Sequence, residues 1–371
     1  MLTLGKITTH RLKWSIPLLR YLVIWLVLVP IAIIRVVSYK TPFSDGDRVL
    51  LSGKVKSEPV RYSSSQGLNF HEVYIYLPAF PEINYGDEIV VEGIYKEGKL
   101  QNPKLHKLTK STNVIYTVRN TIIGIFIRSL PKDVAALTSG MVIGTKTLIS
   151  ESFWEKLKAT GTAHVVVASG MNVTLVAGFL VRLMVIFVSR KKAVLIALVG
   201  IWIYAVMAGF DAPIVRAGIM GSIGLAAVIA GRLNLAWRSL ILSAVVMLII
   251  WPYWIGDLGF ILSFMATLSI MFFERPLASK LKFIPGIVRQ DLSTSLAAQI
   301  GVAPILFFEF GQLNVLSPLI NVFILWTVVP ITIIGILGAL VGLVFEQGGQ
   351  AILYLNYPLA TWFLFVVDIF S

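Results

Sequence analysis

Residues 315–344 read VLSPLINVFILWTVVPITIIGILGALVGLV and contain no charged side chain. A helix needs about 20 apolar residues to cross a hydrocarbon core of ~30 Å, so this stretch predicts one long tilted span or two halves broken at Pro330. We predict further spans in the other apolar stretches of the second half: 165–188, 193–209, 213–231, 238–252, 256–273, 291–310 and 351–370. The sequence therefore predicts a mainly α-helical, polytopic membrane bundle of about 8–10 transmembrane helices.

The composition of the whole chain supports this interpretation. Of its 371 residues, 57% are hydrophobic and 14% are charged. A soluble domain carries roughly 25% charged residues. The absence of cysteine excludes disulfides, thiolate metal sites and a cysteine nucleophile, and the four histidines are not spaced as metal ligands. We expect a partner in the lipid bilayer, no metal and no cofactor.

Residues 1–40 are interpreted as an N-terminal transmembrane anchor, because residues 16–34 are almost wholly apolar. Basic side chains precede this stretch, which places the N-terminus in the cytoplasm. A cleaved signal peptide is the alternative, but the stretch is long and lacks a small-x-small cleavage pattern. Farther along, basic and acidic loops alternate, which places residues 45–160 outside the cell. We predict a multi-pass protein of the cell (plasma) membrane.

Residues 45–110 differ from the rest because polar and apolar residues alternate there. The alternation indicates strands at 48–56, 71–77 and 87–95, and turn-forming residues such as 63–67 separate them. Short strands at this spacing predict a small extracellular β-barrel of the oligonucleotide-binding (OB) type near the N-terminus.

Residues 113–160 predict helices that do not cross the membrane. Residues 113–131 have an apolar face flanked by arginines, as an interfacial helix does. The shorter pieces 132–143 and 150–159 are bounded by glycines and are typical of re-entrant segments, which require a cover of protein or a water-filled cavity. Residues 161–371 then form the polytopic membrane domain.

The densest polar cluster at the entrance of a span lies at residues 161–172. His164, Ser169 and Asn172 fall within about two helical turns of one another. Polar groups are costly in lipid and usually face protein or water. The cluster is therefore either the lining of a pathway or a set of helix–helix contacts through small and hydroxyl residues.

A second polar site opens the span predicted at 213–231. Asp211 and Arg216 flank a proline there, and an arginine that faces a lumen suits a phosphate-bearing solute. The alternatives for Arg216 are an interfacial position or a pair with Asp211. With the three polar residues of the first cluster, these two complete the candidate pathway residues.

The pattern around the first cluster resembles the ComEC family of competence proteins. The resemblance begins with Thr160-Gly161-Thr162-Ala163-His164 and Ser169-Gly170-Met171-Asn172-Val173. Further family-like pieces follow in the family's order: Gly140–Gly144 upstream, Pro213 to Met220 with Arg216-Ala217, Gly231-Arg232, Gly259–Ala266, and Pro304 with Asn321 and Pro330. No single piece is specific, but their order over residues 130–335 is. The predicted barrel also fits the family's N-terminal OB-like domain.

The resemblance implies a channel that carries single-stranded DNA into the cytoplasm during natural transformation. Family members often have a second histidine where this chain has Asn172, and many have a C-terminal metallo-β-lactamase-like domain. That domain needs a histidine cluster, and no histidine follows His164. We therefore expect either a separate nuclease or uptake that is not coupled to degradation, together with a separate DNA receptor and a cytoplasmic ATPase, and leave a homo-oligomer open.

The predicted barrel offers groups that could hold such a strand. Aromatic stacking combined with basic side chains is how proteins bind single-stranded nucleic acid. The candidates are Tyr62, Phe70, Tyr74 and Tyr76, with Lys54, Lys56 and Arg61 nearby. The alternative is that about half of these aromatic rings form the core of the barrel.

Two other classes of function compete with a DNA channel. A small-solute transporter would use Ser169, Asn172 and Asp211 as a polar site at the midplane, although no inverted repeat is visible. A membrane hydrolase would need Ser169 and His164 as nucleophile and base, but they are five residues apart on an apparent helix and diverge. We expect no enzymatic activity. No Walker motif is present, so an ATP-driven motor would be another chain.

Overall fold

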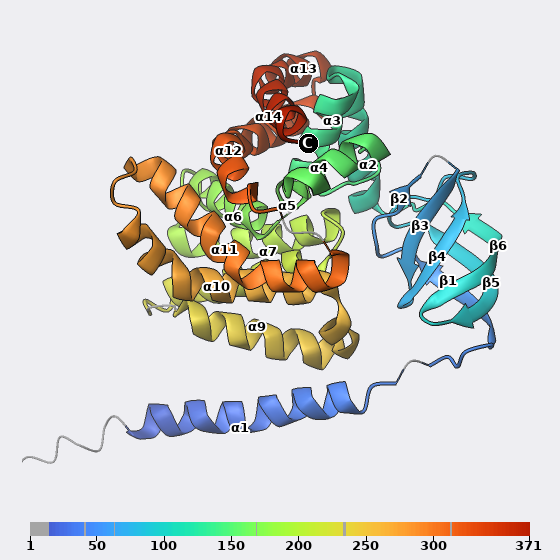
Figure 1. The fold of residues 1–371 in the computed structure, drawn as a ribbon, viewed down its shortest axis with the longest axis horizontal. Helices are drawn as coiled ribbons and strands as arrows, with labels where there is room; N and C mark the ends of the chain where they lie inside the picture. Colours follow the sequence, from blue (N-terminus) through green and yellow to red (C-terminus); the bar gives the residue numbers. More distant parts are fainter. Residues whose placement is uncertain (1–14, 41, 63, 168, 233–234, 312–313) are drawn as a thin grey trace, which may run out of the picture.

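The computed structural model describes residues 15–371 apart from 41, 63, 168, 233–234 and 312–313. A long helix, α1 (Ser15–Val37), leads to a β-sheet domain, and a bundle of helices follows (Figure 1). The strands are β1 (Arg48–Lys54), β2 (Val60–Arg61), β3 (Ser65–Phe70), β4 (Val73–Pro78), β5 (Glu88–Lys96) and β6 (Lys99–Thr109).

These strands form one sheet in the order β1-β5-β6-β4-β3-β2. All neighbours are antiparallel except β4 and β6. The strands β1 and β2 are edges, so the sheet is open and the closed barrel expected from the sequence is not observed. Closure requires the edge strands to pair with each other, and β2 offers only Val60 and Arg61 for such pairing.

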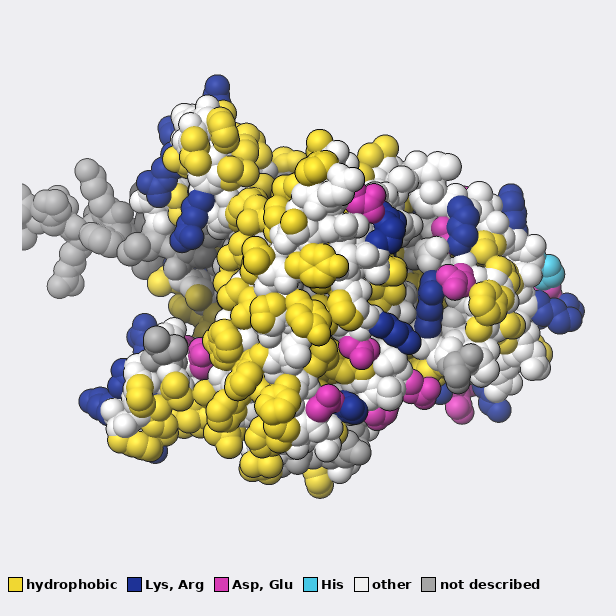
Figure 2. Space-filling model, turned by 90° about the horizontal axis from the view of Figure 1, so that it is seen from above, with side chains coloured by type: hydrophobic (Ala, Val, Ile, Leu, Met, Phe, Trp, Pro, Cys, Tyr) yellow, Lys and Arg dark blue, Asp and Glu magenta, His cyan; other side chains and the backbone are white. Residues whose placement is uncertain are grey.

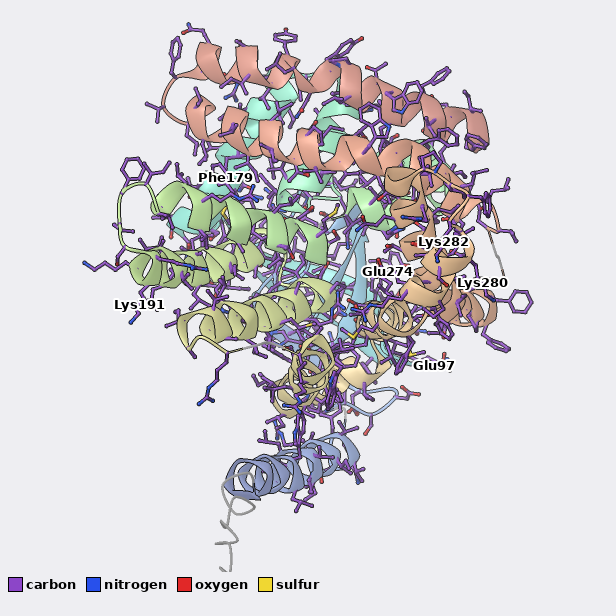
Figure 3. All side chains as sticks on the ribbon, turned by 90° about the vertical axis from the view of Figure 1, so that its left-hand side faces the viewer. Glu97, Phe179, Lys191, Glu274, Lys280 and Lys282 are labelled. Carbon is purple, nitrogen blue, oxygen red and sulfur yellow. The ribbon has the colours of Figure 1, made fainter. Side chains whose placement is uncertain are left out.

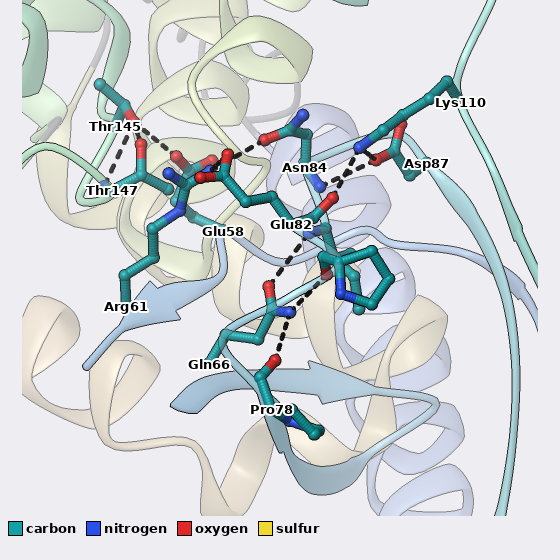
Figure 4. Close-up of polar contacts among 12 residues, drawn as sticks. Glu58, Arg61, Gln66, Pro78, Glu82, Asn84, Asp87, Lys110, Thr145 and Thr147 are labelled. Atoms are coloured by element: carbon teal, nitrogen blue, oxygen red, sulfur yellow. Dashed lines mark hydrogen bonds and ion pairs between the residues drawn. The ribbon is translucent and has the colours of Figure 1, made fainter. Parts of the chain in front are cut away.

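Alternation explains the sheet's core. On β4, the side chains of Val73, Ile75 and Leu77 are buried, while Tyr74 and Tyr76 point to the other face. The expectation of a turn at 63–67 is wrong in part, because β3 begins at Ser65. The side chain of Gln66 is buried there and bonds the backbone of the loop after β4, at Pro78, Pro81 and Ile83, which fixes the strand in place (Figure 4).

Helices α2 to α4 follow the sheet: α2 (Val114–Ser129), α3 (Lys132–Ile143) and α4 (Glu151–Thr160). Their bounds agree with the predicted segments of residues 113–160. The apolar face of α2 is not left free for a lipid surface, since Ile122, Ile125 and Phe126 are buried in the core of the bundle. The middle of α3 is buried as well. Of these three helices, α3 is therefore the one that the protein covers almost completely.

The remaining helices follow most of the predicted spans, but the regions predicted as single spans at 165–188 and 351–370 are each broken into two helices. They are α5 (Ala163–Val166), α6 (Gly170–Met184), α7 (Arg190–Met207), α8 (Ala212–Ile229), α9 (Ala236–Ile250), the short 3-10 turn η1 (Pro252–Gly256), α10 (Leu258–Lys280), α11 (Gly286–Phe310), α12 (Ser317–Gly342), α13 (Glu346–Tyr354) and α14 (Asn356–Phe370). Most of the apolar stretch 315–344 forms one helix, α12, which contains Pro330.

Five helical segments within the described residues are long and apolar enough to cross a membrane. They are Ala163–Met184, Ala212–Ile229, Leu258–Lys280, Val288–Glu309 and Ser317–Gly342. The pair α13 and α14, bent by 44°, makes a sixth if it counts as one span. By this measure the described residues hold fewer spans than the 8–10 predicted. The predicted spans that are left out include α7, which begins with three basic residues, and α9, which is 15 residues long.

The charges are unevenly distributed over the surface. Hydrophobic side chains cover most of the helical part, while basic side chains gather at its far end and on the sheet domain (Figure 2). Viewed from the end opposite the sheet, Lys191 projects from the start of α7, Lys280 from the end of α10, and Lys282 from the connection between α10 and α11 (Figure 3).

Candidate functional site

A groove of about 600 Å³ lies between α6, α7, α8 and α10. Six of its fifteen lining residues are glycine or alanine from α6 and α8: Gly170, Ala177, Gly178, Ala217, Gly221 and Gly224. Small residues let helix backbones and a ligand approach closely. Hydroxyl groups of Thr174 and Thr267 add polar lining, and the positive charge comes from Arg182 and Arg216.

Arg216 is held at the wall by α10. Its Nη1 donates to the carbonyl oxygen of Ser263 at 3.0 Å, and its guanidinium carbon lies 5.8 Å from the ring centroid of Phe264. Its Nε is buried without a hydrogen-bond partner among the described residues. A buried donor without an acceptor costs about 1–3 kcal/mol. An anionic group in the groove would therefore be stabilised at this side chain.

Arg182 sits farther along α6 and also lines the groove. Gly170 and Arg182 are both lining residues of α6, so the groove follows most of that helix. Two cations thus lie along a wall that is largely apolar.

The break between α5 and α6 places the first predicted cluster beside the groove rather than in it. Ser169 precedes Gly170 at the start of α6. Asn172 is 1% exposed, and its Nδ2 donates to the carbonyl oxygen of Met141 at 2.7 Å. His164 Nδ1 lies 3.0 Å from the carbonyl oxygen of Gly161. Of the five predicted pathway residues, Arg216 alone is among the lining residues of the groove.

Asp211 does not pair with Arg216. It lies at the N-cap position of α8, where its Oδ2 is 3.4 Å from Nζ of Lys146. Asn172 and Asp211 are thus engaged with different partners. The midplane site that a small-solute transporter would build from Ser169, Asn172 and Asp211 is not assembled by these contacts.

Three of the four predicted stacking residues form one aromatic cluster on the sheet domain. The ring of Tyr76 lies 6.2 Å from that of Tyr62 and 4.9 Å from that of Tyr74. Tyr76 is 47% exposed. Burial raises the pKa of Tyr74 above its ordinary value of 10.0, with the neighbouring tyrosines as further causes. Phe70 is corrected here: it is 2% exposed and packs in the core of the sheet.

The basic candidates of the sheet domain differ in their availability. Lys54 and Lys56 are exposed at the end of β1 and just after it. Arg61 is engaged inside the domain, where its Nη2 bonds Oδ1 of Asn84 at 3.2 Å and Oε2 of Glu82 at 3.0 Å (Figure 4). The two lysines are therefore the basic side chains open to a ligand among these three.

One group of buried charges escaped the sequence analysis. Glu58 and Arg119 form an ion pair in which their side chains are 4% and 3% exposed. The visible signal was Arg119 itself, an arginine within the apolar helix predicted at 113–131. Sequence reasoning could not supply its partner, because the two residues are 61 positions apart.

Comparison with known proteins shows which family this chain resembles. The model of the competence protein family matches residues 141–371, which hold the groove and every helix that lines it. ComE operon protein 3 of Bacillus subtilis (strain 168) is 26% identical over 233 residues. That alignment covers 60% of this chain and 29% of the relative. No solved structure matches the chain significantly. With the family matched over more than half of its length, the chain belongs to the competence protein (ComEC) family.

Proposed function

We propose that this protein is a membrane channel that carries single-stranded DNA into the cytoplasm during natural transformation. The observation that carries the proposal is Arg216, which lines a groove rich in glycine and alanine and whose Nε has no hydrogen-bond partner within the described part of the chain. Pores for phosphate-bearing solutes use Arg or Lys in this way. The membership in the competence protein family supports DNA as the solute.

The physical properties of the groove suit a single strand. The largely apolar wall of α6 and α8 gives bases a surface with few competing hydrogen-bond groups, while Arg182 and Arg216 provide charge for the backbone phosphates. Small side chains keep the passage open where bulkier residues would close it. With two cations in its lining, the groove should bind the strand weakly. Weak binding favours passage, because the strand must be able to leave the channel.

The sheet domain is proposed to lie outside the cell and to meet the strand first. Its position at the end of the bundle opposite Lys191, Lys280 and Lys282 supports this orientation, because basic loops stay in the cytoplasm (Figure 3). The cluster of Tyr62, Tyr74 and Tyr76 offers rings on which bases can stack. We propose that this open sheet binds single-stranded DNA as an OB domain does. We also propose that a separate DNA receptor, nuclease and ATPase act with the channel.

Uptake of labelled DNA tests the proposal. Cells deleted for the gene are rescued with wild type, Arg216→Ala, Arg216→Lys or Arg275→Ala, and internalised label is measured at equal protein level. Arg275 is the matched control, since it is an exposed arginine on α10, the helix that also contributes to the groove.

We expect internalisation to be lost in the deletion with surface binding intact. Arg216→Ala should fail to rescue, Arg216→Lys should rescue in part, and Arg275→Ala should rescue fully. Unchanged uptake in the deletion would refute the DNA channel and direct attention to small solutes. Full rescue by Arg216→Ala would remove Arg216 from the pathway.

A further inference from the structure

A buried ion pair joins the sheet domain to the helical bundle. Glu58 lies in the connection between β1 and β2, and its Oε2 accepts a hydrogen bond from Nη2 of Arg119 on α2 at 2.6 Å. Both side chains are almost fully buried. Removal of one partner would leave an uncompensated charge in the interior, so the pair holds its two elements in a single arrangement.

The first connection from this pair leads to the end of α7. Nε of Arg119 donates to the carbonyl oxygen of Met207 at 2.8 Å. The guanidinium also lies over the ring of Tyr85, 5.1 Å from its centroid, and the hydroxyl of Tyr85 donates to the carbonyl oxygen of Val206 at 2.8 Å. Burial is the main reason that the pKa of Tyr85 is raised, which keeps this hydroxyl protonated as a donor. The last two residues of α7 are thus held in place by Tyr85 of the sheet domain and Arg119 of α2.

The second connection leads to the start of α8. The other carboxylate oxygen of Glu58, Oε1, accepts a hydrogen bond from the hydroxyl of Thr145 at 2.6 Å (Figure 4). The next residue, Lys146, is the partner of Asp211 at the N-cap position of α8. One carboxylate therefore reaches both ends of the turn between α7 and α8, through Met207 on one side and Asp211 on the other.

That turn is strained. Gly209 has a φ of 101° and Phe210 a φ of 56°, in the left-handed region. For a residue with a side chain, this conformation costs roughly 1–2 kcal/mol. The ring of Phe210 is held between Trp202 and Trp251, with centroids 6.3 Å and 5.7 Å away. The turn keeps this shape because its surroundings impose it, and the helix that it starts carries Arg216.

We propose that Glu58 and Arg119 are positioning residues for the groove. By fixing both ends of the turn between α7 and α8, they set the place of α8 and keep Arg216 on the carbonyl of Ser263. A movement of the sheet domain that separates Glu58 from Arg119 releases both ends of the turn at once. The inference rests on the proposed function only in that it treats Arg216 as a residue of the pathway.

The natural absence of cysteine makes a direct test simple. A single cysteine is placed at Thr267, a lining residue whose hydroxyl shares the carbonyl of Ser263 with Arg216. The matched reporter is Ser279→Cys, at the far end of the same helix. The rate of alkylation by N-ethylmaleimide is measured on the purified full chain in detergent, without DNA, for wild type, Glu58→Gln, Arg119→Lys and Thr145→Val.

The control for these substitutions is Glu346→Gln. It breaks the ion pair of Glu346 with Arg128, an exposed pair that also uses an arginine of α2. Thr145→Val replaces Glu58→Gln in the test if the Glu58 variant does not fold. It removes the hydrogen bond from Thr145 to Glu58 and leaves the buried ion pair of Glu58 with Arg119 in place.

We expect Glu58→Gln and Arg119→Lys to raise the alkylation rate at position 267 by roughly 2- to 30-fold, the usual range for residues that couple two sites. The rate at position 279 should not change, and Glu346→Gln should change neither. An unchanged rate at position 267 in folded variants would overturn the inference, as would an equal rise at both positions. Because DNA is absent from the assay, a failed uptake experiment leaves this result intact, and the reverse holds as well.

Discussion

Gly170 of α6 leaves room for the guanidinium of Arg216 on α8. A Cβ atom on Gly170 would lie 3.2 Å from Nη2 of Arg216 and 3.2 Å from Cβ of Ala217. Both separations are tighter than ordinary van der Waals contact. The hydrogen at this position is therefore what allows α6 and the charged part of α8 to meet at the wall of the groove.

Replacement of Gly170 by alanine should displace Arg216 and lower DNA uptake several-fold, in the same direction as Arg216→Ala. The matched control is Gly286→Ala at the start of α11, because a Cβ there meets nothing within 4 Å and Gly286 does not line the groove. Internalised label in rescued cells, at equal protein level, is the measurement. Equal uptake by the two alanine variants would contradict the role given to Gly170.

The contact between α12 and α13 depends on glycine in a different way. A Cβ on Gly349 would lie 2.7 Å from the carbonyl oxygen of Gly338, and backbone cannot yield as a side chain does. Gly349→Ala should therefore lower the free energy of unfolding by about 1–3 kcal/mol. At the neighbouring position, Gly348→Ala meets mainly the exposed ring of Phe345 and should cost less. Thermal unfolding of both variants in detergent decides, and equal stability would refute the close contact.

Stacking on the sheet domain is predicted to depend on the ring of Tyr76. Stacking of a base on an aromatic ring contributes about 1–3 kcal/mol. Tyr76→Ala should weaken binding of a short single-stranded oligonucleotide by the full chain accordingly, whereas Tyr76→Phe keeps the ring and should bind as wild type does. Titration of a fluorescent oligonucleotide measures this effect. Identical affinities for all three proteins would place the strand elsewhere.

Backbone amides of the sheet domain should lose protection from hydrogen exchange in acid, because Glu92 becomes protonated. Hydrogen bonds from His106 and Arg48 lower the pKa of this carboxyl from its ordinary value of 4.5. For a lowered pKa, the contribution to stability is present above the ordinary value and is lost as the pH falls through the lowered one. Hydrogen exchange of peptides from residues 88–109 should therefore quicken below about pH 5, after correction for the intrinsic rate.

Glu92→Gln should remove this dependence, because the amide carries no charge to lose. Its exchange should already be faster near neutral pH and should change little on acidification. A wild-type pH profile in the variant would assign the acid sensitivity to another group.

The sequence determined the helices and the class of protein. Apolar stretches such as 315–344 and the spacing of basic loops are local properties, and a helix satisfies its backbone hydrogen bonds within one segment. For that reason the predicted bounds agree with α7, α8, α9 and α12 within three residues, although α10 ends seven residues later and α11 begins five residues earlier than predicted. The family motifs from Gly140 to Pro330 gave the same answer, which the match to residues 141–371 confirms.

The sheet was predictable only in part. Alternation located β1, β4 and β5, but β6 and β3 carry polar residues at positions where alternation predicts apolar ones, and the turn-like residues 63–67 concealed the start of β3. Whether the sheet closes depends on how edge strands meet, which no single strand encodes.

Only the tertiary structure decided which polar residues face the groove and which hold the fold. His164, Ser169 and Asn172 are close together along the chain, yet none of them lines the groove. Asn172 donates a hydrogen bond to the carbonyl oxygen of Met141, while Arg216 lines the groove. The partner of Arg119 is Glu58, a residue of the sheet domain. Such choices depend on where distant segments pack, because a buried charge or amide takes the partner that folding brings to it, and periodicity along a helix carries no record of that partner.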